Sequence, residues 1–135
     1  MEKPNLVAVY GSLLSPLHNH GVMKKLGEDH YTFLGHDKTE PKFTLFPLGG
    51  FPGIHENGDT AVEIEVYLVS DELLEGPLDT LEGYDKNNPS ESFYIRKLIP
   101  TKYGEAWIYI YNGPNRYGMS IEDGSWLNYV NNNKY

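Results

Sequence analysis

Apolar and polar residues alternate along much of this chain with a period of two, which is the pattern of β-strands. The clearest run covers residues 60–69, whose apolar side chains are expected on one face and whose other side chains on the opposite face. Residues 6–10 are almost entirely apolar, which predicts a buried strand that ends at Gly11. Further strands are expected at residues 31–35, 43–46, 93–99 and 105–111, the last two forming a hairpin.

A helical period is clearest in the middle of the chain. The apolar stripe of a short amphipathic helix is formed there by Leu74, Leu78 and Leu81. Ser70 is expected to cap the start of this helix and Gly83 its end, while Pro77 predicts a kink or a split. Two more helices are expected, one from about residue 16 to residue 26 and one across residues 121–130.

The segments between these elements predict the loops and the fold class. Residues 48–54 combine three glycines and a proline with apolar side chains, so a rigid, partly buried loop is expected. Residues 85–92 are polar and predict a surface loop or lid. The expected strands greatly outnumber the β-α-β units that a parallel sheet would need. We therefore predict an α+β fold with a single domain, residues 1–135, built as a small mixed, mostly antiparallel β-barrel flanked by short helices.

Composition and charge remove several classes of function. The 135 residues carry a formal net charge of −8, which argues against a nucleic-acid partner because such proteins need a basic face. The absence of cysteine removes disulfides, thiolate nucleophiles and zinc–thiolate sites. His18 and His20 lack ligand-like partners, so no metal site is expected. No run suits a membrane span or a signal peptide, which makes the cytoplasm the expected location.

Glu82 is the candidate catalytic residue. It falls in the last turn of the predicted helix, where the negative end of the helix dipole disfavours the charged carboxylate. A raised pKa would make this side chain a better general base or acid, whereas the alternative is an exposed structural glutamate. Asp79 lies three residues earlier on the same face. It would raise the pKa of Glu82 if unpaired, or would instead cap the helix or pair with an arginine.

The loop after the first strand, Tyr10-Gly11-Ser12-Leu13, is a second candidate. Gly11 permits a sharp turn, and successive backbone N–H groups of such a loop can form a concave site for an anion or a carbonyl group. The alternative is an ordinary turn between a strand and a loop. The residues alone leave both interpretations open.

Several segments together resemble the γ-glutamylcyclotransferase-like family, which includes AIG2-like proteins and γ-glutamylamine cyclotransferases. Each segment is weak evidence alone, but their order and spacing extend over nearly the whole chain. The matching segments are Tyr10-Gly11-Ser12-Leu13, Asn19-His20, Gly50-Phe51-Pro52-Gly53-Ile54, residues 62–67, Leu78-Asp79-Thr80-Leu81-Glu82-Gly83-Tyr84, Tyr94-Ile95-Arg96, residues 106–111 and Ile121-Glu122-Asp123-Gly124-Ser125-Trp126.

The resemblance implies an enzyme that converts a small γ-glutamyl amide, such as a γ-glutamyl amino acid or a γ-glutamylamine, to 5-oxoproline and a free amine. Glu82 matches the family's catalytic glutamate, with Asp79 and Arg96 as supporting residues. Arg96 would either reach the pocket or pair with Asp79 as a buried bridge. No metal or cofactor is implied. The implied substrate-binding residues are Tyr10, Gly11, Ser12, Leu13, Phe51, Pro52, Tyr94 and Tyr111. The alternative is a non-catalytic module of the same fold that binds an amino-acid-like small molecule.

Overall fold

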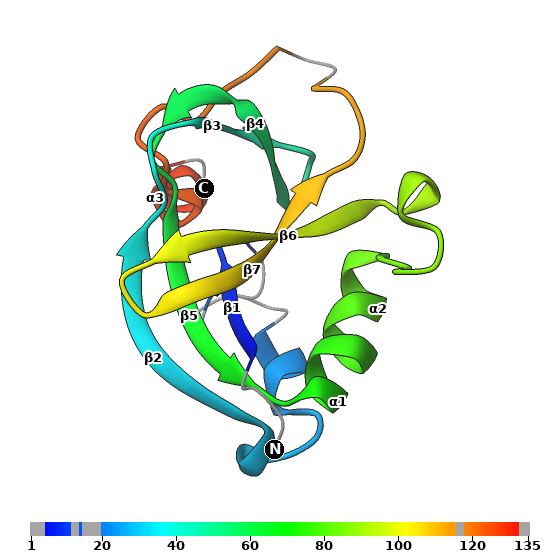
Figure 1. Cartoon of the computed structure of the whole chain (residues 1–135). Helices are drawn as coiled ribbons and strands as arrows, with labels where there is room; N and C mark the ends of the chain where they lie inside the picture. The colour runs from blue at the N-terminus through cyan, green and yellow to red at the C-terminus, as the bar shows by residue number, and fades with distance from the viewer. Residues whose placement is uncertain (1–4, 12–13, 15–19, 116–117, 133–135) are drawn as a thin grey trace.

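The computed structural model describes residues 5–11, 14, 20–115 and 118–132 (Figure 1). Five of its strands form one sheet in the order β2-β5-β1-β7-β6, and β3 pairs separately with β4. β1 runs parallel to β7, while all other described neighbours are antiparallel. The strands are β1 (Asn5–Val9), β2 (Tyr31–Lys38), β3 (Phe43–Pro47), β4 (Pro52–Thr60), β5 (Glu63–Val69), β6 (Tyr94–Thr101) and β7 (Gly104–Tyr111).

The predicted α+β class with mixed sheets is confirmed, but the described strands do not close into the predicted barrel. β2 and β6 are the two outer strands of the five-stranded order and do not pair with each other. β3 and β4 pair together, and β4 lies against β7. The small sheet therefore packs at one end of the large sheet and does not join its two edges (Figure 1).

β5 differs most from its sequence pattern, because both of its faces are buried. Glu65 and Tyr67, expected on the face opposite the apolar side chains, are each only 2% exposed. The Tyr67 hydroxyl donates to Glu65 Oε1 at 2.9 Å, so these two buried polar side chains form a hydrogen bond with each other. The strand also begins later than predicted, at Glu63, because the Val62 N–H donates to Thr39 Oγ1 rather than to the sheet.

The helical segment after β5 is split, as Pro77 predicts. It comprises α1 (Asp71–Leu73), a π-helical turn (Leu74–Leu78) and α2 (Asp79–Glu82). Ser70 Oγ caps its start by accepting from the Leu73 N–H at 3.1 Å, and Gly83 ends it with φ of 64°. The wide turn follows from Pro77, which lacks an N–H and whose ring displaces the carbonyl of the preceding turn.

Three other segments depart from their predictions in extent. Residues 52–54, expected in a rigid loop, belong to β4. The last helix is α3 (Trp126–Asn132), which begins after residue 121 because Ser125 Oγ caps it by accepting from the Asn128 N–H. The described part of the helix expected from residue 16 is a 3₁₀ helix, His20–Lys24, and another spans Glu28–His30. None of the helices in the described ranges is long and apolar enough to cross a membrane.

Residues 85–92 form an exposed loop that leaves α2 and returns to β6, with one turn of 3₁₀ helix at Pro89–Glu91 (Figure 1). Hydrogen bonds tie its two ends together. The Asp85 N–H donates to Ser92 Oγ at 2.9 Å, and the Phe93 N–H donates to the Gly83 carbonyl at 3.0 Å. These bonds hold the end of α2 beside the start of β6.

Candidate functional site

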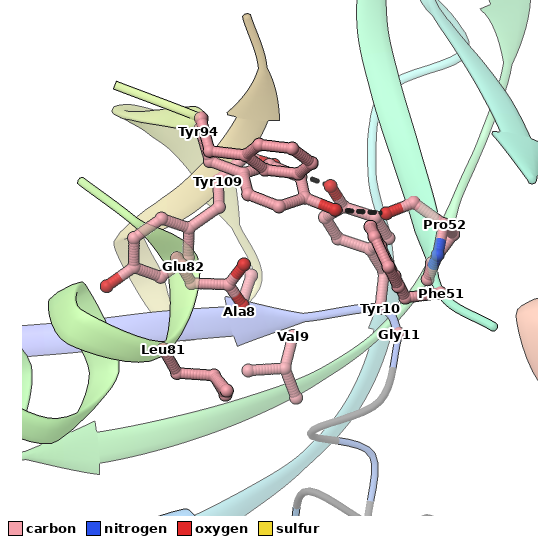
Figure 2. A pocket seen from close by; sticks show the side chains of 11 residues that line it. Ala8, Val9, Tyr10, Gly11, Phe51, Pro52, Leu81, Glu82, Tyr94 and Tyr109 are labelled. Carbon is pink, nitrogen blue, oxygen red and sulfur yellow. Dashed lines mark hydrogen bonds between the residues drawn. The ribbon is translucent and has the colours of Figure 1, made fainter. Parts of the chain in front are cut away.

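A cavity of about 230 Å³ lies where the end of α2 meets β1, β4, β6 and β7 (Figure 2). This volume is slightly below the range of about 300–1,000 Å³ that is usual for small-molecule sites, so the cavity suits a compact ligand. Its walls come from segments far apart in the sequence. The lining residues are Ala8, Val9, Tyr10, Gly11, Phe51, Pro52, Leu81, Glu82, Phe93, Tyr94 and Tyr109.

Glu82 supplies the one carboxylate among these lining residues, and its side chain points into the cavity (Figure 2). No hydrogen bond or ion pair to this carboxylate is present among the residues that the structure describes. Burial raises the pKa of Glu82 to about 8, and the negative charge of Asp79 adds to the shift. The sequence predicts a raised pKa from the helix end; in the structure, burial and a neighbouring charge account for it.

Asp79 is held by an arginine and a tyrosine. Arg96 Nε and Nη2 donate to its two carboxylate oxygens at 2.9 and 3.1 Å, and both side chains are more than nine-tenths buried. The Tyr109 hydroxyl donates to Asp79 Oδ1 at 2.7 Å. The Arg96 guanidinium also lies over the Tyr84 ring at 5.0 Å and the Trp107 ring at 4.5 Å. Asp79 thus both pairs with Arg96 and raises the pKa of Glu82, two roles that the sequence offered as alternatives.

Three tyrosines from separate segments line the cavity: Tyr10 follows β1, Tyr94 lies on β6 and Tyr109 lies on β7. The Tyr10 hydroxyl donates to the Tyr109 carbonyl and the Tyr94 hydroxyl to the Pro52 carbonyl, each at 2.6 Å (Figure 2). Burial raises the pKa of Tyr10, Tyr94 and Tyr109 above the ordinary tyrosine value, with nearby carboxylates adding to the effect. The phenols therefore stay neutral. Because each hydroxyl proton is already committed, their oxygens remain available as acceptors toward a ligand.

The structure brings most of the predicted binding residues to one place. Those that line the cavity with Glu82 are Tyr10, Gly11, Phe51, Pro52 and Tyr94. Tyr111 does not line it; its ring packs behind the wall, 5.2 Å from the Phe93 ring and 5.8 Å from the Tyr94 ring. Ser12 and Leu13 lie outside the described residues. Five lining residues were not predicted from the sequence: Ala8, Val9, Leu81, Phe93 and Tyr109.

The sequence contains a weak indication that Tyr109 belongs to the site. It lies on the same face of its strand as Trp107 and Tyr111, and in the observed hairpin it stands opposite Arg96. That register places its hydroxyl beside the partner of Arg96, which is Asp79. In the described ranges no group of three or more His, Asp or Glu side chains is arranged to hold a metal ion.

A glycine is required at position 11 because the Pro52 ring packs closely against its backbone, not because its backbone angle is unusual. A Cβ atom built on Gly11 would lie 2.7 Å from both Cδ and Cγ of Pro52, and its φ is not positive. We expect Gly11→Ala to push the end of β1 away from β4 and to lower the free energy of unfolding by about 1–3 kcal/mol, measured by urea denaturation. Gly21→Ala is the control because its Cβ would meet nothing within 4 Å. Equal stability of the two variants would contradict this steric explanation.

Comparison with known proteins adds an independent line of evidence. The sequence family described as gamma-glutamyl cyclotransferase, AIG2-like matches residues 7–128. A Vibrio cholerae protein named "Putative gamma-glutamylcyclotransferase" is 39% identical over 126 residues, covering 93% of this chain and 98% of that protein. The "Gamma-glutamylcyclotransferase family protein YtfP" of Escherichia coli K12 is 33% identical, covering 90% of this chain and 95% of that protein. The crystal structure of an AIG2-like protein from Mus musculus has the same fold, with a TM-score of 0.72 at 22% identity over 92% of this chain and 88% of that one.

Proposed function

The chain belongs to the gamma-glutamyl cyclotransferase, AIG2-like family, and from this premise we propose that it converts a small γ-glutamyl amide to 5-oxoproline and a free amine, with Glu82 as general base and acid. The single observation that carries the assignment of Glu82 is its carboxylate in the cavity, with a pKa raised to about 8. The α-amine of a polypeptide terminus has an ordinary pKa of about 7.7–8.0, and the free α-carboxylate of a γ-glutamyl group raises that of the substrate amine above it. The pKa of Glu82 is close enough for a proton to move between the two groups at modest cost.

The reaction needs positioning and proton transfer. The α-amine of the substrate attacks its own γ-carbonyl carbon, a new C–N bond closes the five-membered ring, and the original amide C–N bond then breaks. Glu82 accepts the proton that the attacking nitrogen must lose and delivers it to the leaving nitrogen, so no water is consumed. Because the attack is intramolecular, the walls of the cavity mainly have to hold a reactive conformer.

The surrounding residues suit such a role. Tyr10, Tyr94 and Tyr109 present phenol oxygens as acceptors for substrate N–H groups. Burial and the negative charge of Asp79 keep the pKa of Glu82 high, and Arg96 holds Asp79 in place by pairing with it. The proposal also includes the backbone of Gly11, Ser12 and Leu13 as the site that holds the α-carboxylate or the developing oxyanion. Phe51 and Pro52 would form another part of the cavity wall around the substrate.

The test is detection of 5-oxoproline by mass spectrometry after incubation with γ-glutamyl-alanine, glutathione, γ-glutamyl-ε-lysine and a γ-glutamyl diamine. We expect at least one compound to yield 5-oxoproline and its amine in equal amounts. Incubations without protein correct for spontaneous cyclisation. Saturable binding of a γ-glutamyl compound by folded protein, with no product from any compound, would refute the enzymatic proposal in favour of a binding module.

A further inference from the structure

The open side of the cavity is apolar. Three lining residues are exposed although their side chains are large and hydrophobic: Phe51 (37%), Leu81 (38%) and Phe93 (46%). The closed side is formed by buried residues such as Val9, at 3% exposed, and Tyr109, also at 3%. Grouped exposed apolar side chains commonly mark a binding surface. We call Phe51, Leu81 and Phe93 the rim.

We propose that the rim binds the leaving-amine part of the substrate, so that γ-glutamyl amides of neutral apolar amines are preferred over γ-glutamyl amino acids. This inference rests on the proposed function. The γ-glutamyl group must place its α-amine beside Glu82, inside the cavity, and the amine part is then directed toward the opening. At the opening it meets the rim.

Charge around the cavity supports this preference. None of the described lining residues is Lys, Arg or His, and Glu82 is itself a carboxylate. Arg96, the cation paired with Asp79, donates to both carboxylate oxygens of Asp79 and is more than nine-tenths buried. The chain as a whole carries a net charge of −8. A γ-glutamyl amino acid would bring a second carboxylate on its leaving group, with no cation to meet it among these residues.

The rim is also held in place although it is exposed. The Phe93 N–H donates to the Gly83 carbonyl, and the Phe93 carbonyl accepts from the Asn112 N–H, both at 3.0 Å. The Phe93 ring packs against Tyr94 and Tyr111 with centroids 5.1 and 5.2 Å away, and it lies 6.0 Å from the Phe51 ring. A surface that is ordered before the ligand arrives loses less entropy on binding.

The geometry favours a neutral apolar group over a cationic amine. The Phe51 and Phe93 rings are inclined at 58° to each other, and the third rim residue, Leu81, has no π face. Aromatic cages for cations offer several ring faces, with tryptophan the strongest contributor. Apolar contact requires only removal of the ligand's surface from water, which all three rim residues provide.

The test compares three matched substrates, with kcat/KM measured from 5-oxoproline release. γ-Glutamyl-phenethylamide and γ-glutamyl-phenylalanine differ by a single carboxylate, and γ-glutamyl-1,4-diaminobutane carries a cation. We expect the phenethylamide to exceed γ-glutamyl-phenylalanine by about tenfold or more. Equal values for these two, or a higher value for the diamine compound, would overturn the proposal.

The variant Phe93→Ala tests whether the rim binds the apolar leaving amine. We expect it to lower kcat/KM for the phenethylamide about tenfold, mostly through KM, and to lower kcat/KM for γ-glutamyl-methylamide much less, because the leaving group of that compound is too small to reach the rim. Phe33→Ala is the matched control, since Phe33 is equally exposed at 46% but lies on β2 outside the cavity. Equal loss with both substrates would overturn the role of Phe93.

Calorimetric binding separates failure of this inference from failure of the proposed function. If wild-type protein releases no 5-oxoproline from any compound, the proposed function fails. The dissociation constants of the phenethylamide and γ-glutamyl-methylamide then still test the rim. Tighter binding of the phenethylamide that disappears in Phe93→Ala would support the rim, and equal affinities of the two compounds for the wild type would overturn it.

Discussion

Glu82→Gln is expected to abolish most 5-oxoproline release and, at the same time, to make the protein harder to unfold at high pH. Glutamine keeps the shape of the side chain but cannot carry a proton between nitrogens, so kcat/KM should fall by about 10²–10⁴-fold. In the wild type the pKa of Glu82 is raised from 4.5 to about 8. The charged carboxylate is therefore less favourable in the folded protein than in the unfolded chain.

The sign of the pH dependence follows from the raised pKa. The contribution of Glu82 to wild-type stability is fully present below about pH 4.5 and is lost as pH rises through about 8. Glutamine stays neutral, so the variant should exceed the wild type at pH 9 by on the order of 2–4 kcal/mol and match it at pH 4.5. Urea unfolding at the two pH values measures the difference, with Glu105→Gln on an exposed carboxylate as control. A constant difference across pH, or undiminished turnover, would contradict the role given to Glu82.

Arg96→Met should destabilise the fold strongly, lowering the free energy of unfolding by about 3–5 kcal/mol. Among the described residues it leaves the buried Asp79 carboxylate with the Tyr109 hydroxyl as its one side-chain partner, and it removes the stacking on Tyr84 and Trp107. Arg96→Lys should lose nearly as much, because an ammonium group cannot bind both carboxylate oxygens in the same plane. Urea denaturation at neutral pH measures each loss.

Two comparisons make the Arg96 prediction specific. Lys97→Met removes the neighbouring cation, whose ammonium pairs with Glu56 at 2.6 Å on the exposed surface, and should cost less than about 1 kcal/mol. Combining Arg96→Met with Asp79→Leu removes both buried charges and should recover much of the loss. If Arg96→Met costs no more than Lys97→Met, the buried pair does not stabilise the fold.

Local signals in the sequence predicted local structure well. Ser70 and Gly83 mark the two ends of the helical segment through a side-chain acceptor and a left-handed backbone, and Pro77 marks its split. These effects act within one turn, so a short stretch of sequence contains them. The hairpin of β6 and β7 was likewise visible, because alternation and the turn at residues 102–104 are adjacent in the chain.

Features that depend on distant partners were not predictable in the same way. Alternation placed Glu65 and Tyr67 on the face opposite the apolar side chains, but it did not show that this face of β5 is covered as well. The open sheet depends on β3 pairing with β4, which alternation alone does not specify. At the site, the position of Glu82 could be deduced from the helix end and from the family resemblance. The cavity role of Tyr109 follows from its register opposite Arg96, and that of Phe93 from its bond to Gly83.

The hydrogen bonds that join the two ends of residues 85–92 allow this loop to change in length and sequence without moving α2. Gly83 binds Phe93, and Asp85 binds Ser92, so entry and exit of the loop are fixed side by side. Insertions between these anchors would add only loop-closure entropy, about 0.6 kcal/mol for each doubling of length. The loop can therefore change in length and sequence while the end of α2 keeps its position. In evolutionary terms, this loop can vary independently of the carboxylate that the end of α2 places in the cavity.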